Sequence, residues 1–280
     1  MPELPEVETV RRQLAENLVG RRLVRAEFSR MALRAAIPAR QLARALQGAT
    51  VLQIRRRAKY LLWDFSSGYT MLAHLGMSGH FFIGHEKVDP VRHTHGRWRF
   101  AGLTVHFVDP RRFGLLKLYK TAEVLESAEL AELGPEPFDP IFTPDWLRQS
   151  LKQSAAPIKS WLLDQKRLSG LGNIYANEAL FRSRIHPRRP SHTLRPREAQ
   201  RLHTAIRQVL LAAIEHAGTT FLSYKAPDGG DGAFYDSLLV FQREGLECHR
   251  CGVPIERIVQ SGRSSFFCPT CQKAAPRHPS

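Results

Sequence analysis

Apolar residues recur along this chain with two periods, and the change of period divides it into a first and a second half. Near the start, Val7, Val10, Leu14 and Leu18 recur at helical spacing, and Gly20 follows them. Apolar residues three or four positions apart share one helix face, and glycine commonly ends a helix. The pattern therefore predicts a first helix with one buried stripe.

Between about residues 22 and 120, the apolar residues gather into short runs rich in β-branched and aromatic types. Turn-forming Ser66-Ser67-Gly68 and Ala101-Gly102 separate neighbouring runs. Several short strands with such turns predict a β-sandwich. The expected strands span residues 23–28, 50–54, 60–65, 70–75, 98–100, 103–108 and 115–119.

The second half has mainly helical patterns. Residues 122–133 are expected to form a helix, and Gly134-Pro135-Glu136-Pro137 then marks a domain boundary. Residues 218–237 contain Asp228-Gly229-Gly230-Asp231-Gly232, which favours a loop long enough to be functional. Further helices are expected at about 144–153, 157–164, 174–184 and 196–216.

These elements predict an α+β multidomain protein, with an N-terminal β-sandwich and a leading helix before a helical C-terminal part. We expect no internal repeat. The domains should span residues 1–133 for the sandwich, 134–140 for a linker, 141–237 for the helical domain, 238–272 for a cysteine module and 273–280 for a polar tail.

The charge balance of the chain indicates what kind of partner it binds. The chain has 280 residues with 41 basic and 26 acidic side chains, which gives a net charge of +15. Such an excess favours a polyanion, most commonly nucleic acid, and a polybasic membrane face is the alternative. No run of eighteen or more apolar residues and no signal peptide is found, so a soluble, intracellular protein is expected.

The four cysteines all lie between positions 248 and 271, as Cys248-x2-Cys251 and Cys268-x2-Cys271. Two such turns supply the four thiolates of one tetrahedral Zn²⁺ site. Two disulfides are the alternative, which the expected compartment and the close pairing within each CxxC disfavour. Four thiolate ligands leave no open position on the metal, so a structural zinc is predicted.

The chain begins Met1-Pro2-Glu3-Leu4-Pro5, with Glu6 and Glu8 following. Once Met1 is removed, Pro2 presents a terminal secondary amine, and a free α-amine has a pKa of about 8. This amine can attack an aldehyde-like carbon, with Glu3 as acid or base. The alternative is an ordinary helix start, because proline and acids both favour the first turn.

Six stretches of the chain together resemble one family, the formamidopyrimidine-DNA glycosylases (Fpg or MutM proteins). The resemblance runs from residue 1 to about 272, with the motifs in the family's order. The stretches are Met1–Arg12, Arg56–Tyr60, His74–Gly79, Asp109–Gly114, Gly170–Ala176 and the four cysteines.

The resemblance implies a bifunctional repair enzyme for double-stranded DNA with oxidised bases or abasic sites. Pro2 would attack the sugar C1′, Glu3 would protonate the sugar, and Lys59 and Arg263 would donate protons during β- and δ-elimination. A one-nucleotide gap with phosphates at both ends would result. The resemblance also implies a helix–two-turns–helix motif, a bacterial-type cytoplasmic protein associated with the nucleoid, and no need for more than a monomer.

Several positions match DNA contacts of the family. Met77, Arg111 and Phe113 would fill the space left by a flipped base, and their chemistry suits it: a flexible thioether, a hydrogen-bonding guanidinium and an aromatic wedge. Met77 and Phe113 could instead be core residues, but their glycine-flanked turns argue against this. The other matching positions are His74, His93, Lys159, Asn173 and Tyr175.

Three of these matches have plain alternatives. Lys59 ends the basic run Arg55–Lys59, which can hold phosphate or can be a solvated strand edge. His93 could be an ordinary surface histidine. Asn173 follows Gly170-Leu171-Gly172 as a candidate N-cap, and this loop could hold a phosphate or simply begin a helix.

Two departures from the family leave the range of lesions open. The loop from Asp228 to Phe234 aligns loosely with the family's lesion-capping loop, and Phe241-Gln242-Arg243 stands where Tyr-Gly-Arg is usual. The alternatives are an endonuclease VIII-type glycosylase for oxidised pyrimidines and a non-catalytic zinc-containing protein that binds damaged DNA. Endonuclease VIII-type chains usually begin Pro-Glu-Gly-Pro, whereas this chain has Leu4 and the full Met, Arg and Phe set.

Overall fold

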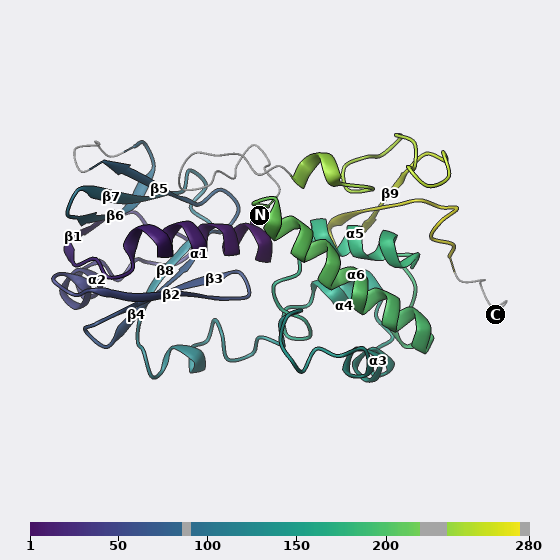
Figure 1. Ribbon diagram of the computed structural model, residues 1–280, viewed down its shortest axis with the longest axis horizontal. Helices are drawn as coiled ribbons and strands as arrows, with labels where there is room; N and C mark the ends of the chain where they lie inside the picture. Colours follow the sequence, from purple (N-terminus) through teal and green to yellow (C-terminus); the bar gives the residue numbers. More distant parts are fainter. Residues whose placement is uncertain (86–90, 219–233, 275–280) are drawn as a thin grey trace. The chain divides into compact units, whose positions relative to one another are not determined.

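The computed structural model describes residues 1–85, 91–218 and 234–274. The chain forms two compact units (Figure 1). Unit 1 comprises Met1–Glu132 with Ile214–Tyr235, and unit 2 comprises Leu133–Ala213 with Asp236–Ser280. The glycine-rich segment predicted at 228–232 lies outside the described residues.

Unit 1 contains two four-stranded antiparallel sheets, as the sandwich prediction requires. One sheet has the order β1 (Leu23–Phe28), β6 (Thr94–Phe100), β7 (Leu103–Val108) and β5 (His80–His85). The other has the order β2 (Val51–Arg57), β3 (Tyr60–Phe65), β4 (Tyr69–His74) and β8 (Leu115–Lys120).

Large aromatic side chains fill the space between the two sheets. The rings of Trp63 on β3 and Phe81 on β5 lie 5.3 Å apart, and those of Trp63 and Trp98 on β6 lie 5.5 Å apart. Each of these side chains is fully buried, and one hydrophobic cluster contains them all. Burial on this scale, at roughly 25 cal/mol per Å² of apolar surface, is what holds the sandwich together.

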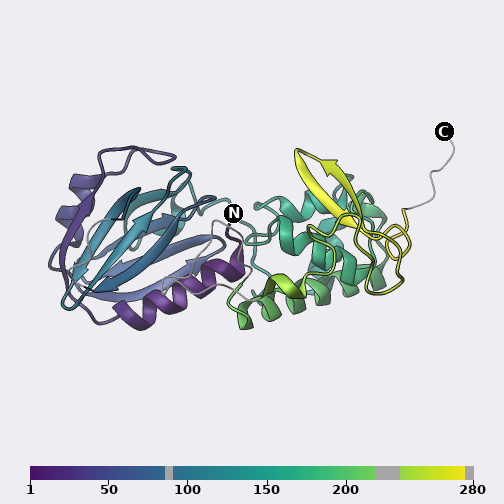
Figure 2. The same cartoon turned by 90° about the horizontal axis from the view of Figure 1, so that it is seen from above.

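Helix α1 (Leu4–Leu18) runs lengthwise along one side of the sandwich (Figures 1 and 2) and packs against β2 and β3. The four residues of its predicted stripe, from Val7 to Leu18, are all fully buried. The helix ends at Val19, and Gly20 follows with a φ of 82°, which glycine adopts without strain. The predicted helix and its stop are therefore confirmed.

Two elements of unit 1 are absent from the prediction, and one predicted element is wrong. Strand β5 and the short helix α2 (Ala39–Leu46) have no counterpart among the predicted elements. The helix predicted at 122–133 is only the 3₁₀ turn η1 (Val124–Glu126). Glu129 accepts hydrogen bonds from Lys117 and Tyr119 of β8, so a tertiary contact outweighs the helical pattern there.

Unit 2 is built from helices α3 (Pro144–Lys152), α4 (Ile158–Leu163), α5 (Asn173–Ser183) and most of α6 (Pro196–Glu215), close to the predicted ranges. The 3₁₀ turn η2 (Ser191–Thr193) precedes α6, and η3 (Phe234–Ser237) follows it. Helix α5 packs against α4 and against the hairpin of β9 (Glu256–Gln260) and β10 (Arg263–Phe267). Nine of its eleven residues are buried, so α5 is the central element of the unit.

In the described part of the chain, no helix is both long and apolar enough to cross a bilayer.

Candidate active site and nucleic-acid interface

The chain start is held firmly against the first turn of α1. Glu3 is the N-cap residue, and its backbone N–H donates to Glu6 Oε2 at 2.8 Å. Glu3 and Glu6 form a capping box, with Pro5 in the first turn. Pro2, Glu3 and Glu6 are all buried. Pro5 and Glu6 therefore serve the helix start, and that start fixes where Pro2 and Glu3 lie.

Glu8 serves a different purpose from the other acids of this turn. Its carboxylate receives hydrogen bonds from Arg11 and Arg12 of α1 and, at 3.1 Å, from Arg56 of β2. Burial alone would raise the pKa of Glu8, but these arginines hold it below its ordinary value. Glu8 therefore joins α1 to the strand that leads to Lys59.

Charged groups from three parts of unit 1 surround the chain terminus. Burial lowers the pKa of the Met1 α-amine below 8.0. The charges of Glu3 and Glu6 oppose that shift, while those of Lys59 and Arg111 add to it. A buried carboxyl, a lysine and an arginine thus lie close enough to this terminus to alter the pKa of its amine. A lowered amine pKa increases the neutral, nucleophilic fraction at physiological pH.

Lys59 lies in the tight turn between β2 and β3, and only 6% of it is exposed. The preceding Ala58 has a φ of 50°, which costs an alanine about 1–2 kcal/mol. Of the neighbouring arginines, Arg55 pairs with Asp64 at 2.6 Å and Arg56 with a carboxylate of α1. Lys59 is therefore a buried amine at a strained turn, and the alternative of a solvated strand edge is wrong for it.

Met77 and Phe113 are exposed at the tips of two loops, by 39% and 44% of their surfaces. They are not core residues, as their glycine-flanked turns predicted. The Arg111 guanidinium lies over the Phe113 ring, 4.9 Å from its centroid. The three residues predicted to fill the space of a flipped base therefore include two exposed apolar side chains and an arginine stacked on one of them.

A buried carboxylate that the sequence analysis missed holds these two loops together. Asp109 accepts a hydrogen bond from Ser78 Oγ at 2.6 Å and another from the Gly114 N–H at 2.7 Å. At Gly76, a Cβ would lie 2.4 Å from the Phe113 carbonyl carbon, so only glycine permits this approach. Because no sequence pattern pairs Ser78 with Asp109, only the fold reveals their role.

His74 is buried, with 7% of its surface exposed, and its Nδ1 accepts a hydrogen bond from the Gly76 N–H at 2.9 Å. Burial, assisted by the charges of Arg34 and Lys59, lowers the pKa of His74 to about 3. The ring is therefore neutral at physiological pH, with the remaining proton on Nε2. A phosphate contact would use this N–H and not a positive charge.

Two further groups lie around this part of unit 1. Arg34, which the sequence analysis missed, is exposed and hydrogen-bonds the Tyr60 side chain next to His74. His93 is exposed, has a φ of 67° and accepts a hydrogen bond on its carbonyl from the Asp109 N–H at 3.0 Å. His93 therefore lies beside the loop that begins at Asp109, and its predicted DNA contact stays a prediction.

The predicted residues of unit 2 gather where α4 and α5 meet β10. Lys159 of α4 is 1% exposed, and its Nζ donates to the Ser264 carbonyl at 2.6 Å and to Ser265 Oγ at 2.7 Å. Asn173 donates to the same carbonyl at 3.1 Å. Arg263 is the exposed first residue of β10. The predicted DNA contact of Lys159 is not tested, but its ammonium is committed to β10.

Two predicted DNA contacts, Asn173 and Tyr175, lie in the first turn of α5. Gly172, not Asn173, is the N-cap residue; Asn173 is the first helical residue, and its Nδ2 donates to the Ser264 carbonyl. Tyr175 is fully buried. The predicted DNA contacts of Asn173 and Tyr175 stay predictions.

At one departure from the family, Gln242 has a φ of 58°. Glycine adopts such a conformation freely, which explains why the family usually has glycine here.

The four cysteines form one compact cluster. Their Sγ atoms all lie within 4.8 Å of one another, with separations of 3.4 Å for Cys251–Cys268 and 4.0 Å for Cys248–Cys271. A disulfide needs about 2.05 Å, whereas four sulfurs about 2.3 Å from one Zn²⁺ lie roughly 3.8 Å apart. The cysteines are free thiols, so the geometry fits one structural zinc and not two disulfides.

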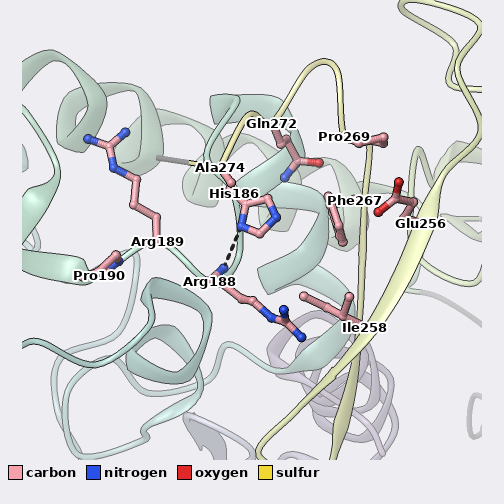
Figure 3. Close-up of a pocket in the computed structure, with 10 residues that line it drawn as sticks. All are labelled: His186, Arg188, Arg189, Pro190, Glu256, Ile258, Phe267, Pro269, Gln272 and Ala274. Carbon is pink, nitrogen blue, oxygen red and sulfur yellow. Dashed lines mark hydrogen bonds between the residues drawn. The ribbon is translucent and has the colours of Figure 1, made fainter. Parts of the chain in front are cut away.

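A separate cavity of about 470 Å³ lies in unit 2, between the segment after α5 and the base of the β9–β10 hairpin (Figure 3). In Figure 3, His186 accepts a hydrogen bond on Nδ1 from the Arg188 N–H, at 3.2 Å. None of the predicted site residues lines this cavity. The candidate chemistry therefore lies elsewhere, on the surfaces described above.

Three family models match almost the whole chain. They describe the formamidopyrimidine-DNA glycosylase N-terminal domain at residues 1–116, the formamidopyrimidine-DNA glycosylase H2TH domain at 133–224, and a zinc finger found in FPG and IleRS at 245–274. The third match agrees with the cysteine cluster, and a structural zinc is thus the metal of this chain.

Curated relatives and solved structures agree with the family models. Formamidopyrimidine-DNA glycosylases from Gluconobacter oxydans and Thermus thermophilus are 46% and 44% identical, covering 98% and 99% of this chain and 100% of each relative. A Lactococcus lactis Fpg in complex with DNA containing an abasic site has a TM-score of 0.90 at 34% identity, covering 98% of this chain and 100% of that one.

The crystal structure of the MutM (Fpg) protein of Thermus thermophilus has a TM-score of 0.87 at 42% identity, with the same two coverages. The likeness therefore covers the buried N-terminus, the sandwich, the helical unit and the cysteine cluster together. By both its sequence and its fold, the chain belongs to the formamidopyrimidine-DNA glycosylase family.

Proposed function

We propose that this protein is a bifunctional DNA glycosylase and abasic-site lyase of base-excision repair. It removes oxidised purines, namely 8-oxoguanine and formamidopyrimidines, from double-stranded DNA, and then cleaves the strand by β,δ-elimination. The observation that carries the proposal is the buried Pro2-Glu3 start of the chain, which the capping box of Glu3 and Glu6 fixes against α1. The DNA-bound Fpg of Lactococcus lactis supports DNA as the partner.

The proposed chemistry begins at Pro2, once Met1 has been removed. Its neutral amine attacks C1′ of the damaged nucleotide, the bond from C1′ to the base breaks, and Glu3 protonates the sugar as its ring opens. The product is an iminium, or Schiff base, between Pro2 and the sugar. The positive charge of the iminium makes the C2′ proton and then the C4′ proton acidic, and their loss to solvent expels the 3′ and then the 5′ phosphate, with Lys59 and Arg263 as proton donors to the leaving groups. A one-nucleotide gap with phosphates at both ends remains.

The proposed DNA contacts complete the site. Met77, Arg111 and Phe113 fill the space of the flipped base. The remaining proposed contacts with the DNA backbone are His74, His93, Asn173 and Tyr175, whereas the ammonium of Lys159 is bound to β10. The zinc held by Cys248, Cys251, Cys268 and Cys271 supports the hairpin that carries Arg263 and takes no part in the chemistry.

We also propose the domain bounds of the protein, its oligomeric state and its location in the cell. The catalytic sandwich domain spans residues 1–133, a linker 134–140, the helix–two-turns–helix domain 141–237, the zinc finger 238–272 and a tail 273–280. The protein acts as a monomer in the cytoplasm, associated with the nucleoid.

Borohydride trapping tests the proposal. Reduction of the Schiff base on DNA with 8-oxoguanine opposite cytosine should give a covalent protein–DNA adduct at Pro2. Because a retained Met1 would turn the Pro2 amine into an unreactive amide, intact-mass measurement must first show that Met1 is absent. If Met1-free protein binds this DNA but gives no adduct, the protein is a damage-binding protein and not an enzyme. Preferential trapping on oxidised pyrimidines would instead support the endonuclease VIII-type activity.

A further inference from the structure

The outer edge of β10 is covered by side chains of α4 and α5. Among the strands that the structure describes, β10 pairs only with β9, in the register Ser264↔Val259 and Phe266↔Arg257. In an antiparallel pair, the N–H and C=O groups of alternate residues point away from the partner strand. On the open side of β10, the Ser264 carbonyl and the Phe266 N–H need partners, and unit 2 supplies both from its helices.

Lys159 is the first of these partners. Its ammonium donates to the Ser264 carbonyl at 2.6 Å and to Ser265 Oγ at 2.7 Å. Ser265 Oγ in turn donates to Gln260 Oε1 at 2.8 Å, at the end of β9. Lys159 therefore holds β10 directly, and the end of β9 through Ser265, close to Arg263 at the start of β10.

Asn177 is the second partner, one turn into α5. Its Oδ1 accepts a hydrogen bond from the Phe266 N–H at 2.9 Å, and its Nδ2 donates to the Asn173 carbonyl at 2.6 Å. Asn177 is 1% exposed, so neither bond competes freely with water. The asparagine thus fixes β10 to the first turn of α5.

The turn that precedes Arg263 is itself tightly constrained. Ser261 and Gly262 have φ values of 48° and 72°, as in a two-residue hairpin turn with both residues left-handed. Arg263 itself is exposed at the end of β10. With the turn on one side and the bonds from Ser264 to Phe266 on the other, the backbone of Arg263 has little freedom.

We infer that Lys159 and Asn177 are positioning residues for Arg263: they act on the reaction through β10 and not by touching DNA. The inference rests on the proposed function, in which Arg263 serves an elimination step. A small displacement of a catalytic group costs reaction rate, so weakening this attachment should affect the step that Arg263 serves more than the others.

The experiment uses the full-length, zinc-loaded protein on DNA with a preformed abasic site. The measured quantity is the ratio of the fully eliminated gap product to the product of β-elimination alone. Arg263→Gln sets the direction in which loss of the arginine moves this ratio.

Lys159→Met and Asn177→Leu should move the ratio in the same direction by about tenfold, while the rate of Schiff-base trapping stays within about twofold of wild type. Lys152→Met, which removes an exposed lysine of α3, is the matched charge control and should leave the ratio unchanged.

Lys159→Arg separates positioning from a direct phosphate contact. Arginine keeps the charge but cannot place a compact ammonium between two acceptors, so positioning predicts that it fails to restore the ratio. Restoration by arginine, together with a reduced salt dependence of DNA binding in Lys159→Met, would overturn the inference. Zinc content and thermal unfolding identify variants that fail to fold, and the milder Ser265→Ala should then still shift the ratio part of the way.

Different results refute the proposed lyase activity and the positioning role. A wild-type protein that cleaves no abasic site refutes the proposed lyase activity itself. A wild-type protein that gives both products, with unchanged ratios in Lys159→Met, Asn177→Leu and Ser265→Ala, refutes only the positioning role.

Discussion

At the scale of single residues, the same short stretch serves structure and chemistry at once. Pro5 and Glu6 start α1, and the capping box that they help to form places Glu3 and the chain terminus. The helix start and the position of the chain terminus therefore depend on the same residues. The chemistry proposed for Pro2 therefore depends on an ordinary helix start, which is why the two interpretations of this stretch do not exclude each other.

Glu3→Gln tests the proposed division of labour at the chain start. Glutamine keeps the shape but cannot supply a proton in the same way, so excision of 8-oxoguanine should fall by about 10²-fold or more. Cleavage at a preformed abasic site, where the base has already left, should fall far less. Single-turnover rates on the two substrates give the comparison, and equal losses on both would contradict the role of Glu3.

His74 makes a prediction about pH. Its pKa falls from 6.5 to about 3 on folding, so below pH 6.5 the unfolded chain binds a proton that the folded chain does not. Stability is therefore present above pH 6.5 and is lost progressively towards pH 3, at up to about 1.4 kcal/mol per pH unit. His74→Gln should reduce this dependence, measured as the free energy of unfolding at several pH values.

The buried histidines His95, His106 and His186 also have lowered pKa values because of burial, so they retain part of the dependence in this variant. An unchanged slope in His74→Gln would mean that His74 is not neutral in the folded protein.

At the scale of elements, side chains of helices make hydrogen bonds to backbone groups that a neighbouring strand would otherwise pair with, and they hold loops in place. Glu178 of α5 is fully buried and accepts hydrogen bonds from the N–H groups of Leu239, Val240 and Phe241, at 2.9 to 3.0 Å. Burial raises the pKa of Glu178, and the three N–H groups partly offset that shift. Helix α5 therefore holds two segments in place. Glu178 binds residues 239–241, which precede the cysteine module, and Asn177 binds strand β10.

The zinc site gives the test at this scale. Cys251→Ser removes one of four ligands from the most exposed position of the cluster. We expect zinc to be released and DNA binding to weaken, because the β9–β10 hairpin loses the metal that closes its base. Zinc content measured by elemental analysis, with DNA affinity alongside, checks this. Full zinc occupancy in the variant would refute the four-cysteine site.

At the scale of the whole molecule, charge is the property that matters. The chain has 41 basic side chains, and some of them are already paired with carboxylates within the fold. Arg55, Arg56 and Arg189 are examples, since each is paired with a carboxylate. The number of phosphates that the protein neutralises is therefore smaller than its number of basic side chains, and only a measurement on DNA supplies it.

The salt dependence of DNA affinity gives that number. If the protein neutralises about six phosphates, log Kd should change with log salt concentration with a slope of about 5. Affinity would then fall by about 10³-fold between about 50 and 200 mM salt. Binding isotherms on an abasic-site duplex over this range provide the slope. A flat dependence would count against binding through the DNA backbone.

Features that depend on local spacing can be predicted from the amino-acid sequence alone. The stripe of α1, most strands of unit 1, the helices of unit 2 and the four-cysteine cluster all follow from periodicity or from fixed motif spacing. The same local logic explains the error at 122–133, where a helical pattern is outweighed by the contacts of Glu129 with β8. It also explains why the motif-matched residues could be named before the fold was known.

Whether each of those residues is exposed, whether it is charged and which other residues it holds in place all depend on how the elements pack together. Burial makes His74 neutral and commits Lys159 to β10, and a basic residue type in a sequence indicates neither outcome. The partnership of Ser78 with Asp109, and that of Asn177 with Phe266, join residues 31 and 89 positions apart. Such pairs arise from packing between elements, and packing is a property of the folded chain and not of any local pattern.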